Sequence, residues 1–353
     1  MNILIVKLSA IGDVIHTLPS LAALRACFPD AHVTWVIEEA ASDLIADHPL
    51  LDRILVSPRK RWIRNLKSGR FMMVFKEFRA FIRDLRARPY DLVIDFHGLL
   101  KSAVIVFLSG GKRKLGYDSL QEFSGLFLTE KIPEDMEKHA VDRYLDFPRY
   151  LGADPGKPSF LISVTDAVAQ RTDLLLRTHL PEPGRPFIAV SPQAFWETKL
   201  WDDEKFAELC DRIMEALKLP VLFTGGDRPA IERIQTRMRH PAINLAGRTT
   251  LRELACLFSL AEILITTDSG PMHLAAAMGT PVVALFGPTD PKRTGPYGEG
   301  HWVIRQALPC SPCFLKTCAT RRCMTEITVD RVFEAVQGQL RERSLRRQTS
   351  GRE

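Results

Sequence analysis

Short apolar runs alternate with longer amphipathic segments along both halves of the chain. In the first half, apolar runs at 2–8, 32–38 and 90–96 are separated by segments with helical periodicity. The pattern restarts in the second half, with runs that include 185–193 and 261–270. Near-continuous apolar strands separated by helices are typical of a parallel sheet that is covered on both faces. The pattern predicts an α/β protein made of two Rossmann-like halves.

The length of 353 residues also favours two domains over a single core. Stretches rich in proline and glycine at 151–160 and 180–186 are suited to linkers between the halves. We predict an N-terminal domain over 1–178, a second domain over 179–330, and a C-terminal helix with a basic tail over 331–353. Ligands of such sheets bind beyond the carboxyl ends of the strands, so polar residues at those ends are the candidates for a site.

Charge and hydropathy narrow the class of partner. The net charge of +6 suits an anionic partner, such as a phosphorylated substrate or an acidic membrane surface. No apolar stretch is long enough for a transmembrane span, and the first apolar run lacks the basic leader of a signal peptide. We predict a cytoplasmic protein that is able to touch a membrane surface.

One strand end in the second half carries the features of an anion site. The stretch "ILITTDSGPMHLAAAMGTPVV" passes from an apolar strand through Asp268 and Ser269 to a helix that begins near Gly270, with His273 in its first turn. A helix start with free backbone N–H groups binds anions readily. Alternatively, Asp268 and Ser269 only cap the helix, and His273 belongs to the core. The next strand also ends in a polar loop, which contains Thr289. Two polar loops at adjacent strand ends favour a binding site over a simple helix cap.

Thr198 and Lys199 follow another strand end of the same half. A lysine there is able to neutralise a departing diphosphate, although a solvated surface lysine is the alternative. The sequence has no Walker loop, no G-x-G-x-x-G and no D-x-D pair. We therefore expect diphosphate charge to be met by Lys199 and helix N-termini, with no metal.

In the first half, Asp13 stands where the first strand turns into a helix. A carboxylate there serves as a helix cap, a ribose ligand or a general base. A basic run, "RKRWIRNLKSGR", contains Lys60, Arg61 and Arg64, and Lys101 adds charge after "DFHGLL". A solvated charge run is the alternative to an anionic acceptor site. No nucleic-acid module accompanies the run, so we predict no nucleic-acid partner.

Four of the seven cysteines cluster near the end of the second half, with the spacing C-x2-C-x4-C-x4-C. A reducing compartment favours bound metal or free thiols over disulfides. The spacing is tighter than in a pair of zinc knuckles, so a loop packed by thiols is slightly favoured over a structural metal site. The residues concerned are Cys310, Cys313, Cys318 and Cys323.

The combination of motifs resembles glycosyltransferase family 9, the lipopolysaccharide heptosyltransferases. The segments that carry the resemblance are "LIVKLSAIGDVIHTLPSLAAL", "YDLVIDFHGLLKSA", "TKLWDDEKF", "TTDSGPMHLAAAMGTPVVALFGPTDP" and "GPYG". The resemblance implies a GT-B fold, with two Rossmann-like domains that face each other across a central cleft. It also implies an ADP-heptose donor substrate, no cofactor, and metal-independent inverting transfer.

The resemblance also assigns roles to individual residues. Asp13 matches the general base, Lys199 the diphosphate-binding lysine, and Asp268 the acidic residue at the donor heptose, with Gly270 and His273 beside the donor. The segments "WVIEEA" and "RKRWIR" are similar to heptosyltransferase I, which implies a Kdo–lipid A acceptor at the cytoplasmic face of the inner membrane. The acceptor contacts implied are Lys60, Arg61 and Arg64.

Two departures keep alternatives open. Ala194 and Phe195 stand where heptosyltransferase I can carry threonines, and the four-cysteine segment is more typical of other branches of the family. A heptosyltransferase II- or III-type enzyme, another nucleotide-sugar transferase or epimerase, and a non-catalytic binding module remain alternatives. The sequence does not predict an oligomeric state.

Overall fold

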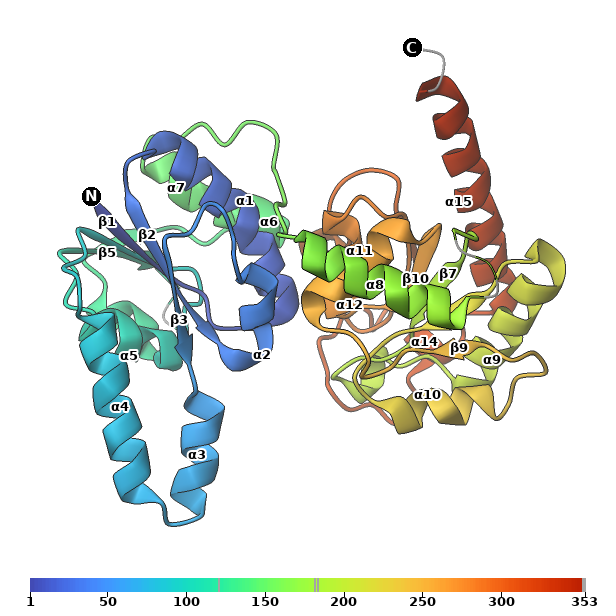
Figure 1. Cartoon of the computed structure of the whole chain (residues 1–353), viewed down its shortest axis with the longest axis horizontal. Helices are drawn as coiled ribbons and strands as arrows, with labels where there is room; N and C mark the ends of the chain where they lie inside the picture. Colours follow the sequence, from blue (N-terminus) through green and yellow to red (C-terminus); the bar gives the residue numbers. More distant parts are fainter. Residues whose placement is uncertain (120, 181, 183, 351–353) are drawn as a thin grey trace. The chain divides into compact units, whose positions relative to one another are not determined.

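The computed structural model describes residues 1–119, 121–180, 182 and 184–350. The chain divides into two compact units, Met1–Ser163 and Val164–Glu353. Each unit contains a six-stranded sheet in which the strands pair in parallel, with helices packed around it (Figure 1). The α/β prediction with two Rossmann-like halves is confirmed. No helix in the described ranges is long and apolar enough to cross a bilayer.

The sheet of the first unit has the strand order β3-β2-β1-β4-β5-β6. Its strands are β1 (Asn2–Val6), β2 (His32–Glu38), β3 (Arg53–Ser57), β4 (Leu92–Asp95), β5 (Arg113–Tyr117) and β6 (Glu130–Ile132). Its helices are α1 (Ile11–Cys27), α2 (Glu39–Ser42), α3 (Arg59–Lys67), α4 (Phe71–Leu85), α5 (Leu100–Leu108), α6 (Ala140–Tyr144) and α7 (Asp146–Tyr150), with 3₁₀ turns η1 (Asp43–Ile45) and η2 (Gln121–Phe127). The strand order changes direction between β1 and β4, where Rossmann-like sheets bind ligands.

The sheet of the second unit has the equivalent order β12-β11-β10-β7-β8-β9. Its strands are β7 (Ile188–Ser191), β8 (Val221–Phe223), β9 (Ile243–Asn244), β10 (Ile263–Thr267), β11 (Val282–Phe286) and β12 (Trp302–Arg305). Its helices are α8 (Asp166–His179), α9 (Asp203–Arg212), α10 (Arg228–Gln235), α11 (Leu251–Leu260), α12 (Gly270–Ala277), α13 (Pro291–Thr294), α14 (Arg322–Thr325) and α15 (Val329–Ser350), with short helical turns η3 (Glu197–Lys199) and η4 (Ile213–Leu217). Here β7 and β10 are the adjacent strands at the reversal.

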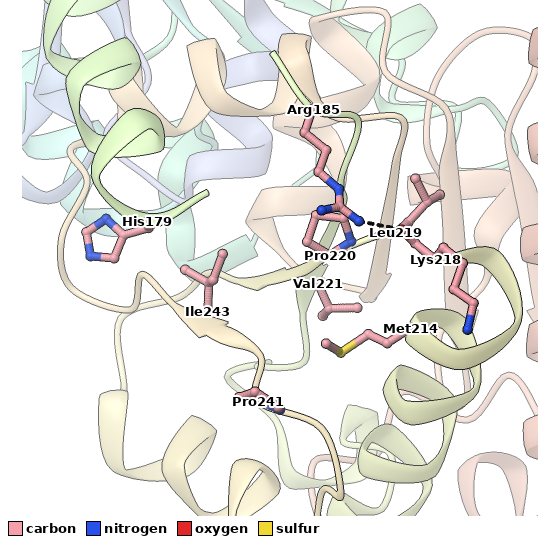
Figure 2. A pocket seen from close by; sticks show the side chains of 9 residues that line it. All are labelled: His179, Arg185, Met214, Lys218, Leu219, Pro220, Val221, Pro241 and Ile243. Atoms are coloured by element: carbon pink, nitrogen blue, oxygen red, sulfur yellow. Dashed lines mark hydrogen bonds between the residues drawn. The ribbon is translucent and has the colours of Figure 1, made fainter. Parts of the chain in front are cut away.

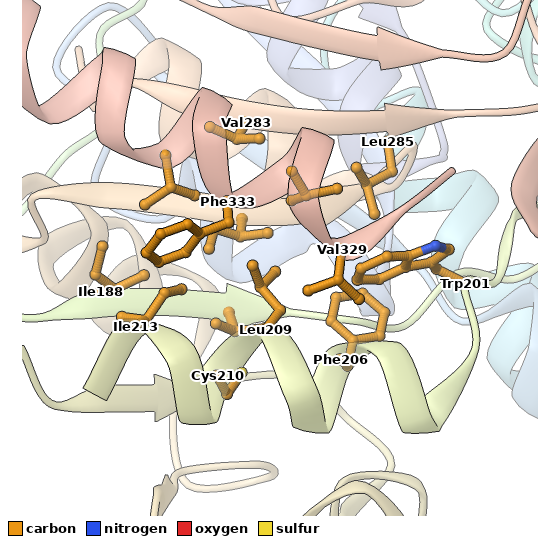
Figure 3. Packing of buried hydrophobic residues seen from close by; sticks show 14 of the residues in the cluster. Ile188, Trp201, Phe206, Leu209, Cys210, Ile213, Val283, Leu285, Val329 and Phe333 are labelled. Carbon is orange, nitrogen blue, oxygen red and sulfur yellow. The ribbon is translucent and has the colours of Figure 1, made fainter. Parts of the chain in front are cut away.

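The core of the second unit joins α9 and α15 to the sheet (Figure 3). Val329 and Phe333, four residues apart on α15, lie beside Phe206 and Leu209 of α9. These side chains pack against Leu285 and its neighbours on the strands, which are buried on both faces of the sheet. The C-terminal helix thus belongs to the core of the second unit, because its i, i+4 apolar stripe has no other surface to cover.

The division between the units precedes α8, whereas the sequence placed it after this helix, between 178 and 179. α8 packs against α11 of the second unit. Arg171 forms an ion pair with Glu253 of α11, at 3.0 Å between Nε and Oε1. The side chain of Arg248 lies 2.7 Å from Nε2 of His179, at the end of α8. The division therefore falls between Ser163 and Val164, a few residues after the stretch 151–160 that the sequence favoured as a linker.

Candidate active site

A buried ion pair lies at the carboxyl edge of the second sheet. The ammonium of Lys199 is 2.6 Å from Oδ2 of Asp268, and the same oxygen accepts a hydrogen bond of 2.6 Å from the hydroxyl of Thr289. Asp268 follows β10, Lys199 lies beyond β7, and Thr289 follows β11, so three neighbouring strand ends meet here. Asp268 is 5% exposed and Lys199 is 16% exposed. The structure thus brings together three of the residues that the sequence placed at a donor site.

The helix that follows Asp268 begins as the sequence predicted. Ser269 is the N-cap of α12, but its hydroxyl contacts the carbonyl of Thr267, at 3.3 Å, and makes no capping hydrogen bond. The first turn contains Gly270 and a buried His273. The Ser269 side chain therefore leaves the first N–H groups of this helix without its own cap. A helix N-terminus without a side-chain cap retains its affinity for an anion.

The polar loop after β8 has a structural role. Oε1 of Gln193 accepts hydrogen bonds from the backbone N–H groups of Gly226 and Asp227, at 2.9 and 3.1 Å. Gly225 has a φ of +145°, which other residues rarely adopt, and a Cβ there would lie 2.3 Å from the same oxygen, so glycine suits this position. The Asp227 side chain caps α10 by accepting from the N–H of Ala230. This loop is held by the fold itself, without a ligand.

The four-cysteine segment wraps around two of the site loops. The hydroxyl of Thr198 donates to the carbonyl of Leu315, at 2.7 Å, so it is already used inside the fold. The N–H groups of Cys313 and Phe314 both donate to the carbonyl of Pro288, next to Thr289. Cys310, Cys313, Cys318 and Cys323 line one cavity of about 400 Å³ together with Thr198. Within the described ranges, no three metal-ligating side chains are grouped closely enough to hold an ion, and the cysteines are free thiols.

A second pocket lies at the opposite edge of the same sheet (Figure 2). It is lined by residues that precede β7 and β8, among them Arg185, Lys218 and Pro220, and its volume is about 350 Å³. The Arg185 guanidinium donates to the carbonyl of Lys218, which closes one side of it. Since ligands of doubly wound sheets bind at the carboxyl ends, this pocket is separate from the candidate site.

In the first unit, Asp13 lies in the first turn of α1, directly beyond β1. Its Oδ2 accepts from the N–H of Ala10, at 3.1 Å, so the carboxylate does cap its own helix. Its Oδ1 accepts from the hydroxyl of Tyr144, at 3.1 Å, and lies 3.9 Å from Nζ of Lys7. The side chain remains 42% exposed. The cap therefore leaves the carboxylate accessible to a substrate.

Lys7 and Tyr144 were not singled out in the sequence. The buried Lys7 ammonium donates to the Tyr144 hydroxyl, at 2.6 Å, and to the carbonyl of Phe96, at 2.9 Å. The sequence did contain a feature that pointed to Lys7, because a lysine interrupts the apolar run "NILIVKL" and a buried charge needs a partner. Tyr144 had no such signal, since it lies 131 residues from Asp13.

The electrostatics of this cluster keep Asp13 ionised. Burial alone would raise the pKa of Asp13, but the Lys7 charge and the hydrogen bonds from Ala10 and Tyr144 hold that pKa below its usual value. Burial lowers the pKa of Lys7, and the nearby Asp13 opposes this shift. Burial, followed by the charge of Asp13, raises the pKa of Tyr144 well above its usual value. The result is an ionised carboxylate next to a neutral phenol that donates to it.

The loop after β4 lies beside Asp13. Oδ1 of Asp95 accepts from the N–H groups of His97 and Gly98, at 2.9 and 3.1 Å, and its other oxygen accepts from Ser102. Both ring nitrogens of His97 are shielded from solvent and have no hydrogen-bond partner in the described part of the chain. Burial, with the charges of Lys7 and Lys101, lowers the pKa of His97 to about 3. The imidazole is therefore neutral, and its two nitrogens are buried without a hydrogen-bond partner among the described residues.

The predicted acceptor residues separate into two groups. Lys101 reaches the site, because its ammonium donates to the hydroxyl of Ser9, at 2.8 Å, in the loop that leads to Asp13. It also lies 3.7 Å from the buried Glu38, which pairs with Arg59 at 2.9 Å. The remaining three residues lie on α3 with exposed side chains; they are Lys60, Arg61 and Arg64. Arg61 is paired with Glu39 and Glu77.

Comparison with known proteins identifies the same family as the sequence motifs. Residues 78–324 match the family described as glycosyltransferase family 9 (heptosyltransferase). Lipopolysaccharide heptosyltransferase 1 of Pseudomonas aeruginosa is 32% identical over 328 residues, which cover 90% of this chain and 87% of that protein.

Two solved structures share the fold. A family 9 glycosyltransferase of Veillonella parvula has a TM-score of 0.83 at 24% identity, with 97% of each chain covered. An Escherichia coli heptosyltransferase solved with ADP has a TM-score of 0.76 at 26% identity, covering 96% of this chain and all of that one, and it is also known with ADP-2-deoxy-2-fluoro heptose. The two parallel sheets with polar strand ends are thus those of a GT-B glycosyltransferase, and the chain belongs to glycosyltransferase family 9, the heptosyltransferases.

Proposed function

We propose that the enzyme moves heptose from ADP-heptose to the Kdo–lipid A inner core of lipopolysaccharide, with inversion and without a metal, at the cytoplasmic face of the inner membrane. The observation that carries the proposal is the Asp13 carboxylate, which is ionised, accessible and held by Lys7 and Tyr144. The Escherichia coli relative binds ADP and a fluorinated ADP-heptose, which supports the choice of donor.

In the proposed reaction, Asp13 accepts the proton of an acceptor hydroxyl. The hydroxyl oxygen forms a bond to the anomeric carbon of the donor heptose from the side opposite ADP. The bond between that carbon and the diphosphate oxygen breaks at the same time, and ADP leaves with the electron pair. Tyr144 and Lys7 hold the carboxylate in position.

The donor side stabilises the leaving group. Lys199 and the uncapped N-terminus of α12 at Ser269, Gly270 and His273 meet the diphosphate charge. Lys199 is neutralised by Asp268 before the donor arrives, at 2.6 Å. A diphosphate supplies a second anionic partner to the same ammonium, and Asp268 is then free to accept a hydrogen bond from a heptose hydroxyl. Thr289 keeps Asp268 oriented through its hydroxyl.

The choice of acceptor has one alternative. The 32% identity to a type 1 enzyme supports Kdo–lipid A, whereas an Escherichia coli type 3 enzyme is 27% identical over 288 residues. The four-cysteine segment, which the resemblance links to other branches of the family, supports a heptosyltransferase II- or III-type enzyme as the alternative. In that case the acceptor would be a core that already carries heptose.

An assay with matched acceptors tests the proposal. The purified enzyme is incubated with ADP-heptose and either Kdo–lipid A or a heptosylated core, in the presence of a chelator, and ADP release and the anomeric configuration are measured. We expect transfer to Kdo–lipid A with inversion and without added metal. Transfer only to the heptosylated core would show that the enzyme is not of type 1 and adds heptose to a core that already carries it. Turnover with UDP-sugars alone, or only with a divalent ion, would contradict the donor or the metal-free mechanism.

We expect Lys7→Met to move the acidic limb of the pH profile of kcat/KM to higher pH. Asp13 is active when deprotonated, and the charge of Lys7 holds its pKa down. Without that charge the pKa rises, so activity is lost at a higher pH as the solution is acidified. Lys112→Met is the matched control, because Lys112 pairs with a different carboxylate, Asp91, at the surface. An unchanged acidic limb in Lys7→Met would show that Lys7 does not set the pKa of the base.

A further inference from the structure

The helical hairpin of α3 and α4 (residues 59–85) has a complete seam between its two helices. The Trp62 ring packs edge-on against Phe78 and Phe81, with centroid distances of 5.6 Å to each. Its indole N–H donates to Glu77, at 2.9 Å, and Val74 is buried. These contacts between the two helices use few of the hairpin's apolar side chains, although Met73 adds one, with its Sδ 3.6 Å from the side-chain nitrogen of Asn65.

The other apolar side chains of the hairpin are largely exposed. Phe71, Met72 and Phe75 near the start of α4 are 64%, 81% and 56% exposed. Three more exposed apolar side chains lie on the same hairpin, and they are Ile63, Leu66 and Met73. The helices project from the rest of the first unit, and the turn that joins them forms the tip (Figure 1). Single exposed apolar residues are ordinary, but six on one small projection form a surface that favours a partner.

Basic residues surround this apolar tip. Between 59 and 79 the chain has one acidic residue, Glu77, and eight basic ones. They are Arg59, Lys60, Arg61, Arg64, Lys67, Arg70, Lys76 and Arg79. The hairpin is thus more positive than the whole chain, whose net charge is +6. At the helical repeat, Lys76 and Arg79 share a face of α4 with Met72 and Phe75.

We infer that the α3–α4 hairpin docks on a bilayer that contains anionic lipids, with Phe71, Met72 and Phe75 inserted among the headgroups. Aromatic and aliphatic side chains interleaved with Lys and Arg on a short helix are the chemistry of an interfacial segment. The basic residues meet the negative surface potential, and the apolar ones enter the boundary of the acyl region.

The hairpin is connected to the acceptor side of the active site. It begins two residues after β3, and Arg59 at its start pairs with the buried Glu38, which also faces Lys101. On the proposed function, docking would hold the edge of the sheet that carries Asp13 near a lipid-anchored acceptor. This link rests on the proposed function, whereas the docking itself does not.

Vesicle co-sedimentation of the full chain tests the docking. We expect binding to vesicles of phosphatidylglycerol and phosphatidylethanolamine, weakened by salt, and little binding to phosphatidylcholine alone. The double substitution Phe71→Glu and Met72→Glu should lower the partition coefficient by about tenfold or more. Leu174→Glu, which changes a 66% exposed leucine on α8, should leave it unchanged. Equal binding of the hairpin variant and the wild type, or no preference for anionic vesicles, would overturn the inference.

Activity measurements separate docking from acceptor recognition. The hairpin variant should match the wild type on a deacylated acceptor in solution and fall behind it on the acceptor embedded in vesicles. A loss on both acceptors, with an unchanged melting temperature, would contradict docking and place the hairpin in acceptor recognition. If the wild type binds vesicles but transfers heptose to no acceptor, the proposed function fails while the docking stands.

Discussion

Replacing Asp13 with Asn should lower kcat by about 10²- to 10⁴-fold, the usual contribution of a positioned general base. The amide keeps the size of the side chain and one acceptor oxygen, so the cap on the Ala10 N–H or the contact with Tyr144 persists. It has no basic oxygen to take a proton. Donor affinity should stay nearly unchanged, because the proposed donor residues belong to the other unit. Turnover by quenched assay and ADP titration by calorimetry measure the two quantities.

A control variant separates catalysis from helix capping. Asp166 also occupies the first turn of a helix, α8, with an exposed side chain. Asp166→Asn should keep full turnover, because it removes only a favourable interaction with the helix dipole. If Asp13→Asn behaves like this control, Asp13 has no part in the chemistry. If instead Asp13→Asn unfolds the chain, circular dichroism will show it.

Lys199→Met should damage both donor binding and stability. The substitution removes the ammonium that we propose faces the diphosphate, and loss of one such charge typically costs about 10²- to 10³-fold in rate. It also leaves Asp268 buried without its counter-charge, which costs about 3–5 kcal/mol in comparable buried pairs. We therefore expect weaker ADP binding by calorimetry, slower turnover, and a lower melting temperature.

A double substitution separates these two effects. Lys199→Met with Asp268→Asn removes the uncompensated charge, so the melting temperature should recover while turnover stays low. Lys292→Met is the matched control for general charge, because Lys292 is an exposed lysine on α13 next to the donor edge. Normal ADP affinity in Lys199→Met would remove Lys199 from the donor site. If Lys292→Met lost as much ADP affinity as Lys199→Met, the role of Lys199 would be only a general effect of positive charge near the donor edge.

Local pattern was enough to predict the strand ends and to place Lys199, Asp268 and Thr289 at one edge of the second sheet. An apolar run followed by Thr-Thr-Asp and a helix start places Asp268 at a sheet edge without knowledge of the rest of the fold. Since the carboxyl ends of parallel strands share one edge, Lys199 and Thr289 could be expected beside it, and the bonds to Asp268 confirm that proximity. That ligands bind at this edge is a general property of parallel sheets with this strand order, and the alternation of strands and helices predicts such a sheet.

Contacts between distant segments could not be predicted in the same way. Nothing near Tyr144 indicates that its hydroxyl meets Asp13, and nothing near Thr198 indicates that its hydroxyl is satisfied by Leu315. The position of α8 was missed for a related reason. Its amphipathic stripe shows that it packs on something, but the choice of α11 depends on the tertiary structure.

The hydrogen-bonded chain from Lys7 through Tyr144 to Asp13 has a consequence for how the enzyme becomes active during folding. It joins the first strand to a helix 137 residues later, so it forms only after the intervening segments of the first unit are in place. Closing such a long loop is slower than forming local helices. The carboxylate that we propose as the general base is therefore completed late, and we expect a nascent or partly refolded chain with most of its helices to be inactive.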